Sequence, residues 1–195
     1  KVLDSKDGSL FIETFANICP DCVVDMLFRV FNAQSIEQRK AFEDGRRNIV
    51  WTLSHLCYIS ETFEKAAETL LLLAVAENEN FSNNATGNFV SLFPVHLPST
   101  CVSLKRRLNF LQEKMKVAVY KPIMMKALRR AVLFRDFLLF KDSVAYGQHE
   151  HVCYKPQTDE EICNYISECL KLIKNEILSD SDKNNFGIGI IEEAV

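Results

Sequence analysis

The sequence predicts an all-α protein, an irregular α-solenoid in which about eight helices stack as antiparallel hairpins. Six glycines and five prolines among 195 residues are too few for the frequent turns of a β-sandwich or barrel. Apolar residues recur at helical spacing instead, and the segment 62–76 is apolar around most of its circumference. We therefore expect this segment to be a spine enclosed by neighbouring helices. No strict repeat period is visible, so the array is irregular.

The apolar periodicity and the prolines divide the chain into successive helical segments. Pro20 suits the first position of a helix, where its missing N–H leaves no bond unmade. Residues 140–154 lack a helical period and are expected to be irregular or weakly extended. The helices are expected at approximately residues 9–18, 20–31, 35–42, 46–57, 62–76, 84–93, 99–118, 122–137 and 158–178.

Capping residues give the expected helix starts. Ser35 and Gln38 have the spacing of a capping box, in which a serine oxygen accepts from the third backbone N–H and the glutamine reaches back. The stretch Thr158-Asp-Glu-Glu161 repeats this spacing before the last helix. We expect Ser60 to cap the spine helix, and Ser99 or Thr100 to begin the helix after the two prolines of the connector.

The chain is expected to form one helical-repeat domain over 1–178, followed by a polar linker or frayed tail over 179–195. Residues 1–44 are a candidate end repeat of a longer array. The first residues include neither an initiator methionine nor an apolar signal core, so the chain is interpreted as a piece of a longer polypeptide.

The bulk charge and the cysteine content restrict the function classes. A formal charge of −3 gives no general attraction to nucleic acid, so any nucleic-acid binding would need a local basic patch. The longest apolar run, 70–76, is far shorter than the roughly 20 residues that cross a bilayer, so no membrane span is expected. Seven cysteines without a framework spacing favour reduced thiols in a cytoplasmic protein.

Several short stretches resemble the helical sensor region of large bacterial STAND-type P-loop NTPases and related multidomain defence proteins. The Asn-Asn-Ala-Thr loop followed by Leu-Phe is the most distinctive of them. The resemblance implies a helical array that senses a ligand, preceded by an effector and an NTPase. No P-loop is present here, so NTPase chemistry would lie elsewhere, and no functional residue of the family is carried over. The stretches that carry the resemblance are Arg46–Trp51, Phe63–Ala67, Leu70–Ala74, Glu77-Asn78, Asn83–Thr86, Leu92-Phe93, Arg107, Gly147-Gln148, Pro156–Thr158, Glu161 and Tyr165.

Candidate metal and catalytic residues are sparse. Cys19-Pro-Asp-Cys22 has the spacing of a redox or half-zinc motif, and the second half of a zinc site would have to come from His149, His151 and Cys153. Two buried thiols near a helix start are the favoured interpretation, so no metal or other cofactor is expected. His55 and His96 have no recognisable nucleophile beside them in the sequence, and we expect no catalytic activity.

Two polar groups are the candidate binding and structural residues. If the stacked helices aligned them, the basic residues would form a stripe able to hold phosphates; the favoured alternative is solvated charge or arginine–carboxylate bonding at turns, for instance between Arg46 or Arg107 and Glu77. The second group is expected to form a loop clasp and a helix cap. The basic set is Arg46, Arg47, Lys105, Arg106, Arg107, Arg129 and Arg130, and the clasp set is Glu77, Asn83, Asn84 and Thr86.

These observations predict a non-catalytic binding or sensor segment of a larger bacterial protein, recognising a protein or a nucleic acid through a broad helical surface. Neighbouring domains of the same polypeptide are the other candidate partners. A structural spacer between domains is the alternative, and an enzyme of unidentified class is the third.

Overall fold

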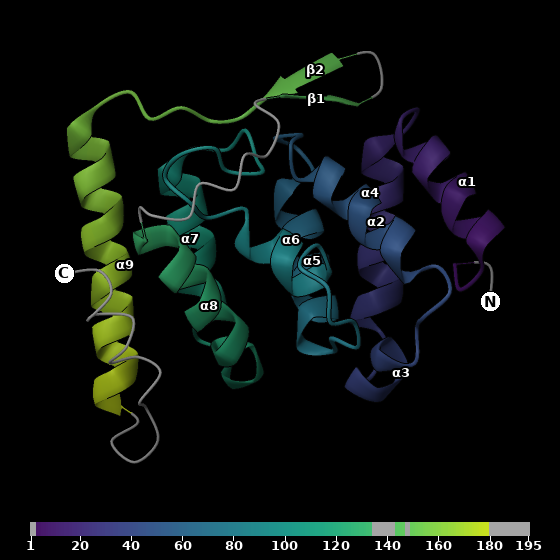
Figure 1. Ribbon diagram of the computed structural model, residues 1–195, viewed down its shortest axis with the longest axis horizontal. Helices are drawn as coiled ribbons and strands as arrows, with labels where there is room; N and C mark the ends of the chain where they lie inside the picture. The colour runs from purple at the N-terminus through teal and green to yellow at the C-terminus, as the bar shows by residue number, and fades with distance from the viewer. Residues whose placement is uncertain (1–2, 134–142, 147–148, 180–195) are drawn as a thin grey trace.

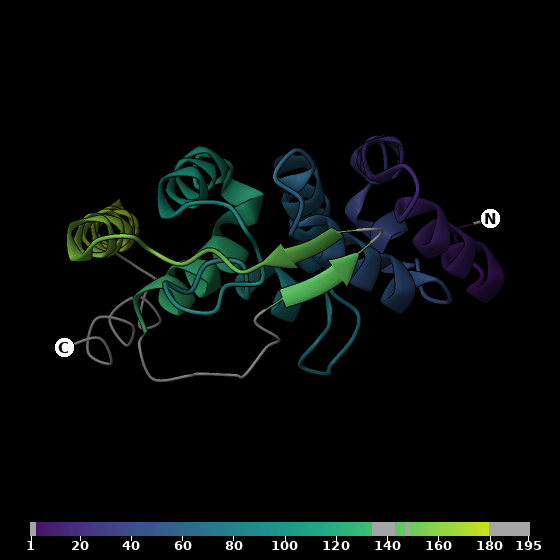
Figure 2. The same ribbon diagram turned by 90° about the horizontal axis from the view of Figure 1, so that it is seen from above.

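The computed structural model describes residues 3–133, 143–146 and 149–179, and these residues are mostly helical, which confirms the all-α prediction. The helices lie side by side along the longest axis of the molecule, with α1 at one end and α9 at the other (Figures 1 and 2). The helices are α1 Lys6–Ala16, α2 Pro20–Asn32, α3 Ile36–Lys40, α4 Arg46–Leu56, α5 Phe63–Val75, α6 Ala85–Val90, α7 Leu104–Lys114, the 3₁₀ turn η1 Ala118–Tyr120, α8 Lys121–Val132 and α9 Asp159–Ser179.

A small antiparallel hairpin interrupts the helices between α8 and α9. Its strands are β1 Ser143–Tyr146 and β2 His149–Val152, with Tyr146 opposite His149. It lies along one edge of the row of helices (Figure 1). We expected irregular or weakly extended chain over 140–154. The described strands within that stretch are extended and form a hairpin.

The spine prediction for 62–76 is confirmed by α5. This helix contacts α2, α3, α4, α6 and α8. Leu72 is 3% exposed and Leu73 is fully buried, although they point away from the principal apolar stripe. Burying one such leucine contributes roughly 1.5–3 kcal/mol, so α5 is a major source of stability.

Two expected helix starts are wrong, because the hydroxyls concerned bind elsewhere. Ser60 does not cap α5: the residue before that helix is Thr62, whose hydroxyl donates to the Leu56 carbonyl at 2.6 Å. The helix after the prolines begins at Leu104, capped by Ser103, and not at Ser99 or Thr100. The Thr100 hydroxyl donates instead to the carbonyl of Cys57 at 2.7 Å and ties the connector to the end of α4.

One of the two predicted capping boxes forms completely, and the other forms in part. Ser35 and Gln38 form the complete capping box of α3. At the start of α9 the Glu161 N–H donates to the Thr158 hydroxyl at 3.1 Å, but the Glu161 carboxylate accepts from the N–H of Gln157 instead of closing the box on Thr158. The part of the 122–137 helix beyond residue 133 and the tail beyond residue 179 lie outside the described residues. None of the described helices is long and apolar enough to cross a bilayer.

Candidate functional site

The predicted basic stripe is broken, because two of its arginines turn inward. Arg46 and Arg107 are both fully buried, which corrects their assignment to a basic surface. Arg106 is partly exposed, and its guanidinium forms a two-pronged contact with Glu64, with both N···O distances 2.6 Å. The remaining members keep outward positions: Arg47 and Lys105 are exposed, whereas Arg129 and Arg130 are half-buried near the end of α8.

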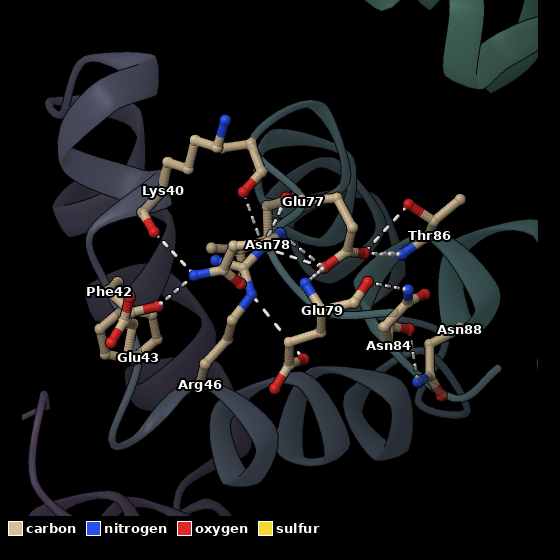
Figure 3. A network of polar contacts seen from close by, with 12 residues as sticks. Lys40, Phe42, Glu43, Arg46, Glu77, Asn78, Glu79, Asn84, Thr86 and Asn88 are labelled. Carbon is tan, nitrogen blue, oxygen red and sulfur yellow. Dashed lines mark hydrogen bonds and ion pairs between the residues drawn. The ribbon is translucent and has the colours of Figure 1, made fainter. Parts of the chain in front are cut away.

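Arg46 binds the carboxyl end of the spine helix. Its Nη2 donates to the carbonyls of Leu73 at 2.8 Å and Ala76 at 3.1 Å, and Nη1 donates to the carbonyl of Arg39 at 3.0 Å. The Glu77 carboxylate lies 3.4 Å from Nη2 (Figure 3). Burial lowers the pKa of Arg46, and the nearby carboxylates oppose that shift. The predicted arginine–carboxylate contact at this turn is therefore confirmed.

Glu77 connects Arg46 to the next helix. Its second oxygen, Oε2, accepts from the N–H of Thr86 at 2.8 Å and from its hydroxyl at 3.0 Å (Figure 3). The Asn84 side chain caps α6 by accepting from the Gly87 N–H at 2.9 Å. Asn83 contributes its backbone carbonyl, which accepts from the side chain of Asn88. The predicted clasp is confirmed for Glu77, Asn84 and Thr86, and it fixes the turn from α5 to α6.

Arg107 is buried in a different way. Its Nη1 donates to the carbonyls of Pro94 at 2.6 Å and Leu92 at 3.3 Å, whereas Nε and Nη2 have no hydrogen-bond partner among the described residues. Its guanidinium lies 5.6 Å from the ring centre of Tyr154 and 5.8 Å from that of Tyr165. Burial lowers its pKa. The alternative of an Arg107–Glu77 contact is therefore wrong, because Arg107 binds the chain that follows α6.

The described cysteine and histidine candidates do not form a metal site, and the side chains of His149 and His151 lie outside the described part of the chain. Cys19 and Cys22 form a disulfide at the start of α2, and Cys22 is exposed, which corrects the expectation of two buried, reduced thiols for this pair. Cys153 is buried, with its sulfur 4.0 Å from the Tyr58 hydroxyl. Within the described residues no group of three or more histidine, cysteine or acidic side chains is arranged to hold a metal ion. His55 is half-buried on α4, and His96 is exposed in the connector before α7.

A groove lies between α7 and α9, and sequence reasoning did not predict it. It encloses about 370 Å³ between the amino-terminal halves of the two helices, which lie next to each other (Figure 1). Its accessible surface is mainly apolar. We call its polar and charged lining residues the rim: Lys105, Thr158, Glu160, Glu161, Asn164 and Glu168. The residues that line it are Leu104, Lys105, Leu108, Thr158, Glu160, Glu161, Asn164, Tyr165 and Glu168.

Hydrogen bonds hold parts of this groove in place. The Glu161 carboxylate accepts from the Tyr154 hydroxyl at 2.6 Å and from the Gln157 N–H at 3.1 Å. The bond to Glu161 also raises the pKa of Tyr154, which keeps that hydroxyl protonated as a donor. The buried Tyr165 donates to the carbonyl of Phe93 at 2.9 Å. Two of the lining residues, Glu161 and Tyr165, are thus held by bonds to other parts of the chain.

No protein-family model matches the chain, and neither the curated proteins nor the solved structures contain a significant match.

Proposed function

We propose that this chain is a non-catalytic, helical-repeat binding segment of a larger cytoplasmic protein, and that it recognises a protein ligand. Its architecture in this proposal is an irregular α-solenoid. The row of helices from α1 to α9 supports that arrangement (Figures 1 and 2). So does the Arg46–Glu77–Thr86 clasp, because it fixes the angle between successive helices by side-chain bonds.

The groove between α7 and α9 is the observation that carries the proposal. A largely apolar concavity with a few polar groups on its rim is typical of a recognition site. The inward-turned arginines favour a protein ligand over a nucleic-acid ligand. Arg46 and Arg107 donate to backbone carbonyls inside the chain and are not available to bind phosphates.

The proposal extends to the sensor role that the STAND-type resemblance implies. The stretches that carry the resemblance include Arg46, Glu77, Thr86, Arg107 and Tyr165, and each of these side chains binds another helix or turn within the chain. A likeness in such residues supports a common architecture. It says nothing about a common ligand, which would be chosen by surface residues outside this set.

A bulky residue placed in the groove tests the proposal. Asn164 is exposed and lines the groove, so Asn164→Trp fills the space without replacing a core residue. Asn175→Trp adds the same side chain at another exposed position of α9 that does not line the groove. Each immobilised full chain is incubated with lysate of the source organism, cross-linked and analysed by mass spectrometry.

The expected result is a protein that the unmodified chain and Asn175→Trp retain, that cross-links to α7 or α9, and that Asn164→Trp retains at least about ten-fold less. If the three chains retain the same proteins in the same amounts, the groove is not a recognition site. The spacer function would then be the better account.

A further inference from the structure

We infer that the groove between α7 and α9 binds a basic protein segment, which inserts one apolar side chain between the helices and pairs its flanking lysine or arginine residues with the glutamates of the rim. This inference rests on the proposed function and specifies the partner's chemistry.

The size and lining of the groove indicate a single apolar anchor. A space of about 370 Å³ holds one large side chain and not a folded surface. Leu108 is the partly exposed apolar residue of the lining, and Leu104 and Tyr165 lie behind it in buried positions. One aromatic or aliphatic anchor in a desolvated pocket, surrounded by polar contacts, is the usual arrangement of a protein-binding hot spot.

The charge of the rim decides between basic and acidic partners. Glu160, Glu161 and Glu168 line the groove from α9, against the single ammonium of Lys105 from α7. Asp159 adds a fourth carboxylate in the first turn of α9. An acidic segment would meet like charges at short range, whereas a basic one would meet a complementary field.

Two of these carboxylates differ in how they are held. Glu161 is fixed by Tyr154 and Gln157 and accepts further bonds without first having to be ordered. Glu168 forms an ion pair at 2.6 Å with Lys171, but both side chains are substantially exposed. Exposed pairs of this kind contribute little to stability, so an incoming cation can displace Lys171 at small cost.

A selection from a peptide library tests the inference directly. A phage-displayed library of random peptides is panned on the full chain, and the enriched peptides are synthesised with a fluorophore for binding measurements. We expect enrichment of peptides in which a large apolar residue lies within a few positions of two or more lysine or arginine residues.

Charge reversal then locates the interaction. Glu160→Lys changes an exposed rim residue, and Glu113→Lys makes the same change at an exposed position of α7 outside the groove. For the enriched peptides, we expect Glu160→Lys to weaken binding by about ten-fold or more and Glu113→Lys to change it by less than about two-fold. Asn164→Trp abolishes binding, and added salt weakens it.

The outcomes separate the two claims. Peptides that lose binding to Asn164→Trp but show no basic bias and no response to Glu160→Lys overturn the basic-partner inference and leave the proposed function intact. Enrichment of acidic peptides has the same consequence. If no enriched peptide depends on Asn164, the groove binds no protein segment, and both claims fail.

Discussion

Arg46 and Arg107 are the same residue type at the same degree of burial, yet their charges are compensated differently. Each is fully buried, and each donates to backbone carbonyls at or beyond the end of another helix, α5 for Arg46 and α6 for Arg107. Arg46 has the Glu77 carboxylate at 3.4 Å and that of Glu79 at 3.9 Å. Arg107 has two tyrosine rings and no ion pair with any described residue.

The common part of the two sites explains why a cation is buried at all. The last carbonyls of a helix have no partner within the helix, and buried carbonyls need one. Arginine is suited to several such carbonyls because its planar fork presents five donors. Arg39 acts similarly, donating to the Leu72 carbonyl at 3.1 Å. The two sites therefore differ in the counter-charge and also in the carbonyls that are bound, since those of Leu92 and Pro94 lie beyond the end of α6.

The largest expected effect comes from removing Arg46. Arg46→Met keeps most of the volume but removes the guanidinium that donates to the Leu73 and Ala76 carbonyls and pairs with the Glu77 carboxylate. Because breaking a buried pair leaves an uncompensated charge, we expect a loss of about 3–5 kcal/mol in the free energy of unfolding, measured by urea titration.

The neighbouring Arg47 provides the matched control for that experiment. It is exposed and lies over the ring of Phe81, 4.6 Å from its centre. Arg47→Met should therefore reduce the free energy of unfolding by less than about 1 kcal/mol. Equal losses in the two variants would show that the clasp does not stabilise the fold.

Arg107→Met should have a smaller effect than Arg46→Met. The substitution removes donors from the Leu92 and Pro94 carbonyls, but it also removes a buried charge that the Glu161 carboxylate attracts without forming a direct ion pair. These contributions oppose each other, so we expect a net loss of about 1–2 kcal/mol in the same titration. A loss as large as that of Arg46→Met would mean that the attraction between Arg107 and Glu161 compensates the buried charge as well as a direct ion pair does.

Thr86→Val isolates one bond on the far side of the clasp. The variant loses the hydroxyl that donates to Glu77 at 3.0 Å and keeps the backbone N–H bond to the same oxygen. We expect a loss of about 1 kcal/mol. Since Arg46 and Thr86 share Glu77, the double variant should lose less than the sum of the two single variants. Strict additivity would indicate that the two bonds act independently.

The elements that were predicted from the sequence are those with local signals. Periodicity gave the spine helix, and the serine–glutamine spacing gave the cap of α3. The Ser60 and Ser99 or Thr100 predictions failed because serine and threonine hydroxyls also bind groups other than helix N–H groups: Ser60 accepts from Arg106, and Thr100 donates to the Cys57 carbonyl.

The burial of the arginines and the groove have no such local signal. A charge pattern does not show which carbonyls will face a guanidinium, so Arg46 and Arg107 were assigned to a surface. Residues 104–108 and 158–168 form the walls of the groove. These stretches are far apart in the sequence, with α8 and the hairpin between them. Only the apolar spacing of Leu104 and Leu108 and the capping box at Glu161 mark those stretches in the sequence.

The smallest expected effect concerns Glu79 and its dependence on pH. Burial raises the pKa of Glu79 above 4.5, although Arg46 opposes the shift. The folded state therefore binds this proton more readily than the unfolded state, and Glu79 contributes more stability as the pH falls through its folded pKa toward 4.5. Glu79→Gln removes this dependence. The stability of the variant relative to the unmodified chain should thus be highest near neutral pH and decline on acidification, in urea titrations at several pH values. The opposite slope would mean that attraction to Arg46 outweighs burial at Glu79, and that this side of the Arg46 site is a fully compensated ion pair.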